Sequence, residues 1–266
     1  FVLGAGYWET PGRNQSNVLK RAKLLTFRSV SLAQKSQYDG YNAQYIPCPA
    51  LCSATFEKTI QTPQEVGLVF SIGANNSVPF AAVNEDCASY IQKLYPYLIQ
   101  QLSRTVKFRV ICHYIDELAT AHQIFRPFNI PVYYSYEAKD YFDIYAACDF
   151  VLSSRVHGCG IAASLGIPSI HIAHDDRADT CKGFLTKEID YKTPVKDVLD
   201  SICAGLKTAH DQNLKLKQHK KAVFEKYVTE VKSANTDCPN YSPFLDEYYC
   251  NKKIERIITS YFKKTK

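Results

Sequence analysis

The 266-residue sequence predicts an α/β fold whose parallel sheet is covered by helices on both faces. Between residues 65 and 174, strand-like runs alternate with segments of helical periodicity. The runs are almost continuously apolar, which is typical of strands buried on both faces of a parallel sheet. Hydrophobic residues make up 46% of the chain, which is ordinary for a globular protein with a buried core.

The front of the chain, residues 1–60, predicts part of a separate Rossmann-like half. It suggests a strand, a polar turn, a helix, a short strand over residues 24–29 and another helix. The stretch "YIPCPALC" is apolar with two prolines and suits a crossing between two domains, so we expect a boundary near residues 50–64. The first residues resemble a buried strand rather than a signal peptide, and we expect that a further segment precedes them.

The second half, residues 61–190, is expected to be a Rossmann-like domain. Its strands are predicted over residues 65–74, 107–114, 130–136, 149–154 and 168–174. Its helices are predicted over residues 84–104, 117–128, 138–148 and 158–166. Pro96 should kink or split the first helix, and Asp116 should cap the second.

Residues 191–266 predict a charged helical segment: one long or two consecutive helices, a polar turn and a last helix. The net charge of +6 comes largely from the basic end of this segment. Because no recognition motif accompanies these charges, we favour a solvated amphipathic helix over nucleic-acid binding. No apolar run reaches the about 18 residues of a membrane span, so no transmembrane segment is expected.

The ten cysteines do not predict a disulfide framework or a metal site. There is no C-x-x-C pair, and Cys48 and Cys52 have no second pair behind them. In a strand, His171 and His174 would face opposite sides and would not chelate one ion together. We therefore expect free thiols, no metal and a reducing, cytoplasmic environment.

Charged residues at the ends of strands indicate a site for an anion. Arg155 and His157 directly follow the fourth predicted strand of the second half, where doubly wound sheets bind ligands. Gly158 lies where a helix begins, so backbone amides can approach an anion. Arg177 follows the next strand, and Arg28 ends the short strand of the front segment. Together these groups predict a pocket for phosphate or carboxylate.

A purely structural interpretation stays open beside this one. Arg155 could form a salt bridge with Asp175 or Asp176, and His157 could cap the helix.

Residues 148–177, "CDFVLSSRVHGCGIAASLGIPSIHIAHDDR", resemble the signature of the polysaccharide pyruvyl transferases. That pattern runs from an apolar strand through R-[LV]-H-G (residues 155–158), a small-residue helix and L-G-I-P (residues 165–168) to a second strand and an arginine. "LLTFRSVSLAQK" (residues 24–35) is similar to the family's strand-R-[DES]-x-x-S segment, and "YIPCPAL" to its apolar proline segment.

The resemblance implies a GT-B-like fold of two Rossmann-like halves, here with a shortened N-terminal half. It implies transfer of an enolpyruvyl unit from phosphoenolpyruvate to a sugar of a cell-surface polysaccharide or its precursor, forming a ketal without a cofactor. Whether the acceptor is lipid-linked stays open. The family's donor-site residues carry over onto Arg155, His157, Arg28 and Arg177.

The mechanism that we expect uses the arginines and the amide of Gly158 to bind the donor, and His157 to transfer a proton. Nearby cations should lower the pKa of His157 and keep it neutral. Two rival interpretations are a nucleotide-sugar glycosyltransferase on the same fold and a non-catalytic, anion-binding remnant. The small apolar segment after His157 leaves little to hold a nucleoside, whereas the shortened front half supports the remnant.

Overall fold

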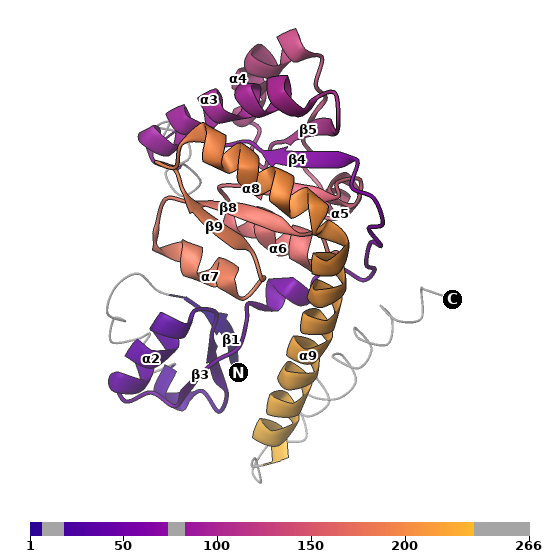
Figure 1. Ribbon diagram of the computed structural model, residues 1–266. Helices are drawn as coiled ribbons and strands as arrows, with labels where there is room; N and C mark the ends of the chain where they lie inside the picture. Colours follow the sequence, from indigo (N-terminus) through magenta and orange to yellow (C-terminus); the bar gives the residue numbers. More distant parts are fainter. Residues whose placement is uncertain (7–18, 74–82, 237–266) are drawn as a thin grey trace.

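The computed structural model describes residues 1–6, 19–73 and 83–236 (Figure 1). These residues form two sheets in which all paired strands are parallel. The larger sheet has the strand order β6-β5-β4-β7-β8-β9, and the smaller has the order β1-β2-β3. The predicted α/β fold with parallel sheets is confirmed. The division into residues 1–60, 61–190 and 191–266 stays a prediction.

The larger sheet contains the five predicted strands of the second half and a sixth. Its strands are β4 (Glu65–Val69), β5 (Lys107–Ile111), β6 (Val132–Tyr133), β7 (Phe150–Ser153), β8 (Ser169–Ala173) and β9 (Lys187–Asp190). The sequence did not predict β9, because Ile189 is the one buried residue of this edge strand and the apolar run is missing. Strand β6 is shorter than predicted, since it is the other edge and pairs only with β5.

Helices cover both faces of this sheet (Figure 1). One face packs against α3 (Glu85–Leu102), α4 (Glu117–Phe125) and α8 (Val195–Lys207). The other face packs against α5 (Asp140–Ala146) and α6 (Val156–Ser164).

Helix α3 is continuous through Pro96, so the predicted split does not occur. The residues around the proline, such as Tyr95 and Leu98, are fully buried in the core. Burial of large side chains contributes about 1.5–3 kcal/mol each, which offsets the cost of about 3 kcal/mol for a proline inside a helix.

The smaller sheet is formed by β1 (Val2–Ala5), β2 (Leu25–Phe27) and β3 (Ala43–Tyr45), with α2 (Val30–Tyr38) packed beside it. Strand β2 corresponds to the predicted strand at residues 24–29, whereas β3 was not predicted. The predicted polar turn and part of the first predicted helix fall on residues 7–18, outside the described residues.

Helix α9 (Ala209–Thr236) runs alongside both sheets and forms hydrogen bonds with residues next to each of them (Figure 1). Near its start, Asn213 Nδ2 donates to the carbonyl oxygen of Gly166 at 2.6 Å. Further along, Tyr227 Oη donates to the carbonyl oxygen of Pro47 at 2.8 Å, and Lys226 Nζ to that of Tyr45 at 3.2 Å. The charged segment therefore begins as two consecutive helices, α8 and α9, and its predicted last helix lies outside the described residues.

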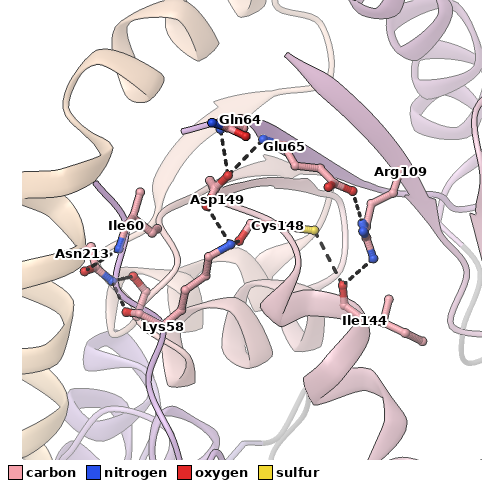
Figure 2. A network of polar contacts seen from close by, with 10 residues as sticks. Lys58, Ile60, Gln64, Glu65, Arg109, Ile144, Cys148, Asp149 and Asn213 are labelled. Carbon is pink, nitrogen blue, oxygen red and sulfur yellow. Dashed lines mark hydrogen bonds and ion pairs between the residues drawn. The ribbon is translucent and has the colours of Figure 1, made fainter. Parts of the chain in front are cut away.

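A polar network fixes residues 58–65, which lead into β4, to the amino edge of the larger sheet (Figure 2). Asp149 accepts hydrogen bonds from the backbone N–H groups of Gln64 at 2.8 Å and Glu65 at 3.0 Å. Lys58 Nζ lies 2.7 Å from Asp149 Oδ1 and donates to the carbonyl oxygen of Cys148 at 2.9 Å. This network lies at the edge opposite to the candidate site.

Within the described residues, no helix is both long enough and apolar enough to span a bilayer. All eight cysteines of this part of the chain are free thiols.

Candidate functional site

The candidate site lies at the carboxyl edge of the larger sheet, where β4 and β7 are neighbours. The connections after these two strands lead to opposite sides of the sheet. Ligands bind at such a junction in doubly wound sheets. Just beyond the two strands, Ser71 Oγ and Ser154 Oγ lie 2.9 Å apart and hold the strand ends together.

The turn from β7 into α6 carries the predicted R-x-H-G residues. Ser153 Oγ lies 2.9 Å from both the amide nitrogen and the carbonyl oxygen of Arg155, so one hydroxyl fixes the turn. Gly158 packs against this hydroxyl, because a Cβ at this position would lie 2.5 Å from Ser153 Oγ. Absence of a side chain therefore lets α6 begin close to the sheet, with its first amides at the site.

His157 lies in the first turn of α6 and is exposed. It does not cap the helix, since Arg155 occupies the N-cap position. Partial loss of hydration lowers the pKa of the imidazole below 6.5, and the guanidinium groups of Arg28, Arg177 and Arg155 lower it further. The charges of Arg28, Arg155 and Arg177 therefore act on the imidazole of His157, and the part they play at this site stays a prediction.

Arg28 reaches this site from the smaller sheet. Its amide nitrogen donates to the carbonyl oxygen of Ala5 at 3.3 Å, and its side chain passes Gly6, where a Cβ would lie 2.9 Å from Arg28 Nε. This Nε is buried without a hydrogen-bond partner among the described residues, and the guanidinium forms no ion pair with any of them. Arg28 thus brings a positive charge that the described part of the chain does not neutralise.

Arg177 is paired with a carboxylate two residues away. Its Nε donates to Asp175 Oδ2 at 2.8 Å, and its Nη2 binds the same oxygen. Hydrogen bonding to Asp175 raises the pKa of Arg177. Burial opposes ionisation of Asp175, but the bond from Arg177 holds the pKa of this carboxyl below its usual range. The carboxylate predicted as a partner of Arg155 is therefore occupied by Arg177.

Arg155 forms an ion pair with Glu117, the first residue of α4, whereas Asp175, which the structural interpretation offered as its partner, pairs with Arg177. Glu117 also accepts hydrogen bonds from two backbone N–H groups before the helix. Asp116, the predicted cap of this helix, makes no capping hydrogen bond with its side chain. Sequence analysis missed Glu117, although it follows β5, the strand beside β4.

A carboxylate of α7 (Asp179–Lys182) also binds the start of α2, the helix that follows Arg28. Asp179, which begins α7, accepts hydrogen bonds from Ser29 Oγ and, at 3.0 Å, from Ser31 Oγ. Since Ser29 directly follows Arg28, these bonds set the position of Arg28 relative to the larger sheet. We refer to the three residues Ser29, Ser31 and Asp179 as the serine–aspartate clasp.

His171 in β8 and His174 just after it do not form a metal site with other described residues. His174 Nε2 lies 3.2 Å from the carbonyl oxygen of Ser154, and its Nδ1 lies 3.5 Å from Asp175. His171 is fully buried, and burial, assisted by His174, lowers its pKa to about 4. Residues 1–6, 19–73 and 83–236 contain no group of three His, Cys, Asp or Glu side chains that could hold a metal ion.

Comparison with known proteins identifies both a family and a fold. A family model described as "Polysaccharide pyruvyl transferase" matches residues 1–176. No curated protein matches the sequence. A protein assigned as a UDP-N-acetylglucosamine 2-epimerase, from Listeria monocytogenes, aligns with a TM-score of 0.52 and 12% identity over 76% of this chain and 56% of that one. S. aureus MnaA, solved with UDP, aligns with a TM-score of 0.53 and 13% identity over 75% of this chain and 57% of that one.

The chain therefore spans little more than half the length of these two solved structures. At this identity the similarity concerns the fold alone, and it confirms the predicted GT-B-like arrangement of Rossmann-like sheets.

Proposed function

Because this chain belongs to the polysaccharide pyruvyl transferase family, we propose that it transfers an enolpyruvyl unit from phosphoenolpyruvate to a sugar. The acceptor in this proposal is a sugar of a cell-surface polysaccharide or of its precursor. The observation that carries the proposal is the start of α6, where Arg155 occupies the N-cap and His157 lies in the first turn, with Arg28, whose buried Nε has no hydrogen-bond partner in the described part of the chain, as a further cation.

The proposed donor carries a phosphate and a carboxylate, about three negative charges at neutral pH. Guanidinium groups match both anions in shape and charge. The first amides of α6, including that of Gly158, add further donors at the same edge. A compact polyanion is therefore the ligand that suits this set of groups.

His157 is the proposed proton-transfer residue. Its lowered pKa keeps the imidazole neutral at pH 7, so it can accept the proton of an attacking sugar hydroxyl. The hydroxyl oxygen bonds to C2 of the donor, and the proton passes to C3, which becomes a methyl group. Phosphate then leaves C2, a second hydroxyl of the same sugar bonds there, and its proton leaves with the phosphate. The products are a cyclic ketal and inorganic phosphate.

The test is a comparison of wild type with His157→Ala. Phosphate release is measured with phosphoenolpyruvate and a panel of methyl and p-nitrophenyl glycosides that carry two neighbouring free hydroxyls. We expect phosphate release by the wild type with at least one glycoside and a loss of about 100-fold in the variant, with donor affinity largely retained. Activity of the variant within a few-fold of wild type would refute the role of His157.

A nucleotide-sugar transferase is the alternative that the fold leaves open, since S. aureus MnaA was solved with UDP. Thermal-shift measurements with phosphoenolpyruvate, UDP and GDP separate the two functions. We expect stabilisation by phosphoenolpyruvate alone. Stabilisation by a nucleoside diphosphate and not by phosphoenolpyruvate would replace the proposal.

A further inference from the structure

Glu117 places a buried carboxylate beside the candidate site. The residue is 1% exposed. One of its oxygens binds Arg155 Nη2, and the other accepts hydrogen bonds from the backbone N–H groups of His113 at 2.8 Å and Tyr114 at 3.1 Å. A carboxylate buried to this extent is stable only when it is paired and hydrogen-bonded, as it is here.

The guanidinium of Arg155 is held from two directions. Glu117 binds one edge, and the ring of Tyr114 lies against the face, with Arg155 Cζ 4.6 Å from the ring centroid. The Arg155 side chain is 10% exposed. A planar cation held at an edge and on a face keeps one orientation, which a long side chain alone does not provide.

We propose that Glu117 is a positioning residue of the donor site, which acts by fixing the guanidinium of Arg155 against Tyr114 and by offsetting its charge. The proposal rests on the proposed function, since it assigns Arg155 to donor binding. Glu117 itself does not touch the donor in this arrangement. Its contribution to donor binding and to proton transfer passes through Arg155.

The same arrangement of residues recurs at the opposite edge of the larger sheet and provides a control. There Glu65 pairs with Arg109, and Arg109 Cζ lies 4.6 Å from the centroid of the Tyr133 ring. Figure 2 shows this Glu65–Arg109 pair next to the network around Asp149, at the amino edge of the strands. Both arrangements consist of Glu, Arg and Tyr with partly or fully buried charges, but only the Glu117 arrangement adjoins His157.

Positioning and simple electrostatics predict opposite results when Glu117 loses its charge. If Glu117 only added negative charge near the site, Glu117→Gln would strengthen the binding of an anionic donor. If it positions Arg155, the same substitution leaves the guanidinium without its fixed edge contact and weakens donor binding. Glutamine keeps the size of the side chain and an oxygen that can accept the two backbone hydrogen bonds.

The experiment compares wild type, Glu117→Gln and Glu65→Gln by calorimetric titration with phosphoenolpyruvate. We expect Glu117→Gln to weaken binding about tenfold or more, which is the usual effect of losing a hydrogen bond to a charged group. Glu65→Gln should bind the donor as the wild type does. Unchanged or tighter binding by Glu117→Gln would overturn the proposal.

A second measurement needs no donor. Proton NMR titration follows the pKa of His157 among the seven histidines, assigned through His157→Ala. Without Glu117, the charge of Arg155 acts on His157 without its counter-charge, so the pKa of His157 should fall further in Glu117→Gln and stay unchanged in Glu65→Gln. If the pKa of His157 is the same in Glu117→Gln as in Glu65→Gln, Glu117 does not act on His157 through Arg155, and the proposal is overturned.

The calorimetric and NMR measurements distinguish a failure of the proposed function from a failure of the positioning role of Glu117. A wild type that binds no phosphoenolpyruvate contradicts the proposed function, while the NMR titration still decides whether Glu117 acts on His157. If Glu117→Gln does not fold, Tyr114→Leu removes the aromatic contact with the face of Arg155 from a partly exposed position, with Tyr133→Leu as its control. Weaker donor binding in Tyr114→Leu alone supports the proposal, and equal binding in both variants overturns it.

Discussion

The serine–aspartate clasp connects the segment after β2, which begins with Arg28, to α7, which follows β8 of the larger sheet. Asp179 accepts hydrogen bonds from Ser29 Oγ and Ser31 Oγ, and Ser29 is 3% exposed. We predict that Asp179→Ala lowers the free energy of unfolding and weakens the binding of phosphoenolpyruvate, because Arg28 then loses its connection to the rest of the site.

The size of the effect follows from the ionisation of Asp179. Burial alone would raise the pKa of this carboxyl, but hydrogen bonds from Ser29, Lys182 and Ser31 lower it from 3.8 to about 2. At about 1.4 kcal/mol per pKa unit, the carboxylate contributes about 2 kcal/mol at neutral pH. Lys182 is 67% exposed, so its ion pair supplies a small share and the two hydroxyls supply most.

Unfolding followed by circular dichroism from pH 7 to pH 2 measures this contribution, with Lys182→Ala as the control. Since the folded-state pKa of Asp179 lies below the unfolded value, its stabilisation is present above about pH 4 and is lost as the pH falls towards 2. The wild type should therefore exceed Asp179→Ala by about 2 kcal/mol at pH 7 and by almost nothing near pH 2. A loss no larger than that of Lys182→Ala, or one independent of pH, would refute the role of the clasp.

Two further predictions concern the glycine of the first turn of α6 and a buried histidine. Gly158→Ala places a Cβ 2.5 Å from Ser153 Oγ, and this overpacking should lower the free energy of unfolding by about 1–3 kcal/mol. We expect a lower melting temperature and weaker donor binding. An unchanged melting temperature would contradict the close approach. His171 has a folded-state pKa of about 4 against 6.5 when unfolded, so stability is fully present above about pH 6.5 and is lost as the pH falls. This residue alone should cost about 1 kcal/mol at pH 5.5, and His171→Asn should remove that part of the acid sensitivity. Paired unfolding curves at pH 5.5 and pH 8 would reveal the difference.

The strands that the sequence predicted are those buried on both faces. Residues such as Val66, Leu68 and Val69 form continuous apolar runs, because each contributes to a core on one side of the sheet or the other. Strand β9 carries one buried residue, Ile189, and its remaining positions are polar and exposed. An edge strand of this kind leaves no periodic signal, since one buried side chain defines neither a strand nor a helix.

The sequence predicted the place of the candidate site in the fold, but not the ion pair between Arg155 and Glu117. Arg155, His157 and Arg177 follow neighbouring strands, and a parallel sheet brings such ends together whatever lies between them. Glu117, the partner of Arg155, lies 38 residues away and follows β5, whose place in the sheet is not encoded by local spacing. The sequence could suggest Glu117 only after the strand order had placed β5 beside β4 and β4 beside β7.

The three arginines differ in what their removal leaves behind, and this difference permits a last prediction. Arg155 neutralises the buried Glu117, and Arg177 neutralises Asp175, whereas Arg28 has no carboxylate partner among the described residues. Arg155→Ala therefore leaves the buried carboxylate of Glu117 without its counter-charge and should lower both donor affinity and the free energy of unfolding.

Arg28→Ala leaves no such charge in the described part of the chain and relieves repulsion from the other two cations. We expect it to weaken phosphoenolpyruvate binding while the melting temperature stays equal to that of wild type or rises, as is common where groups are held for function rather than for folding. Calorimetry and thermal unfolding on the two variants decide the point. A marked loss of stability in Arg28→Ala would mean that this guanidinium serves the fold, and that the positive charge at the site is no sign of a bound anion.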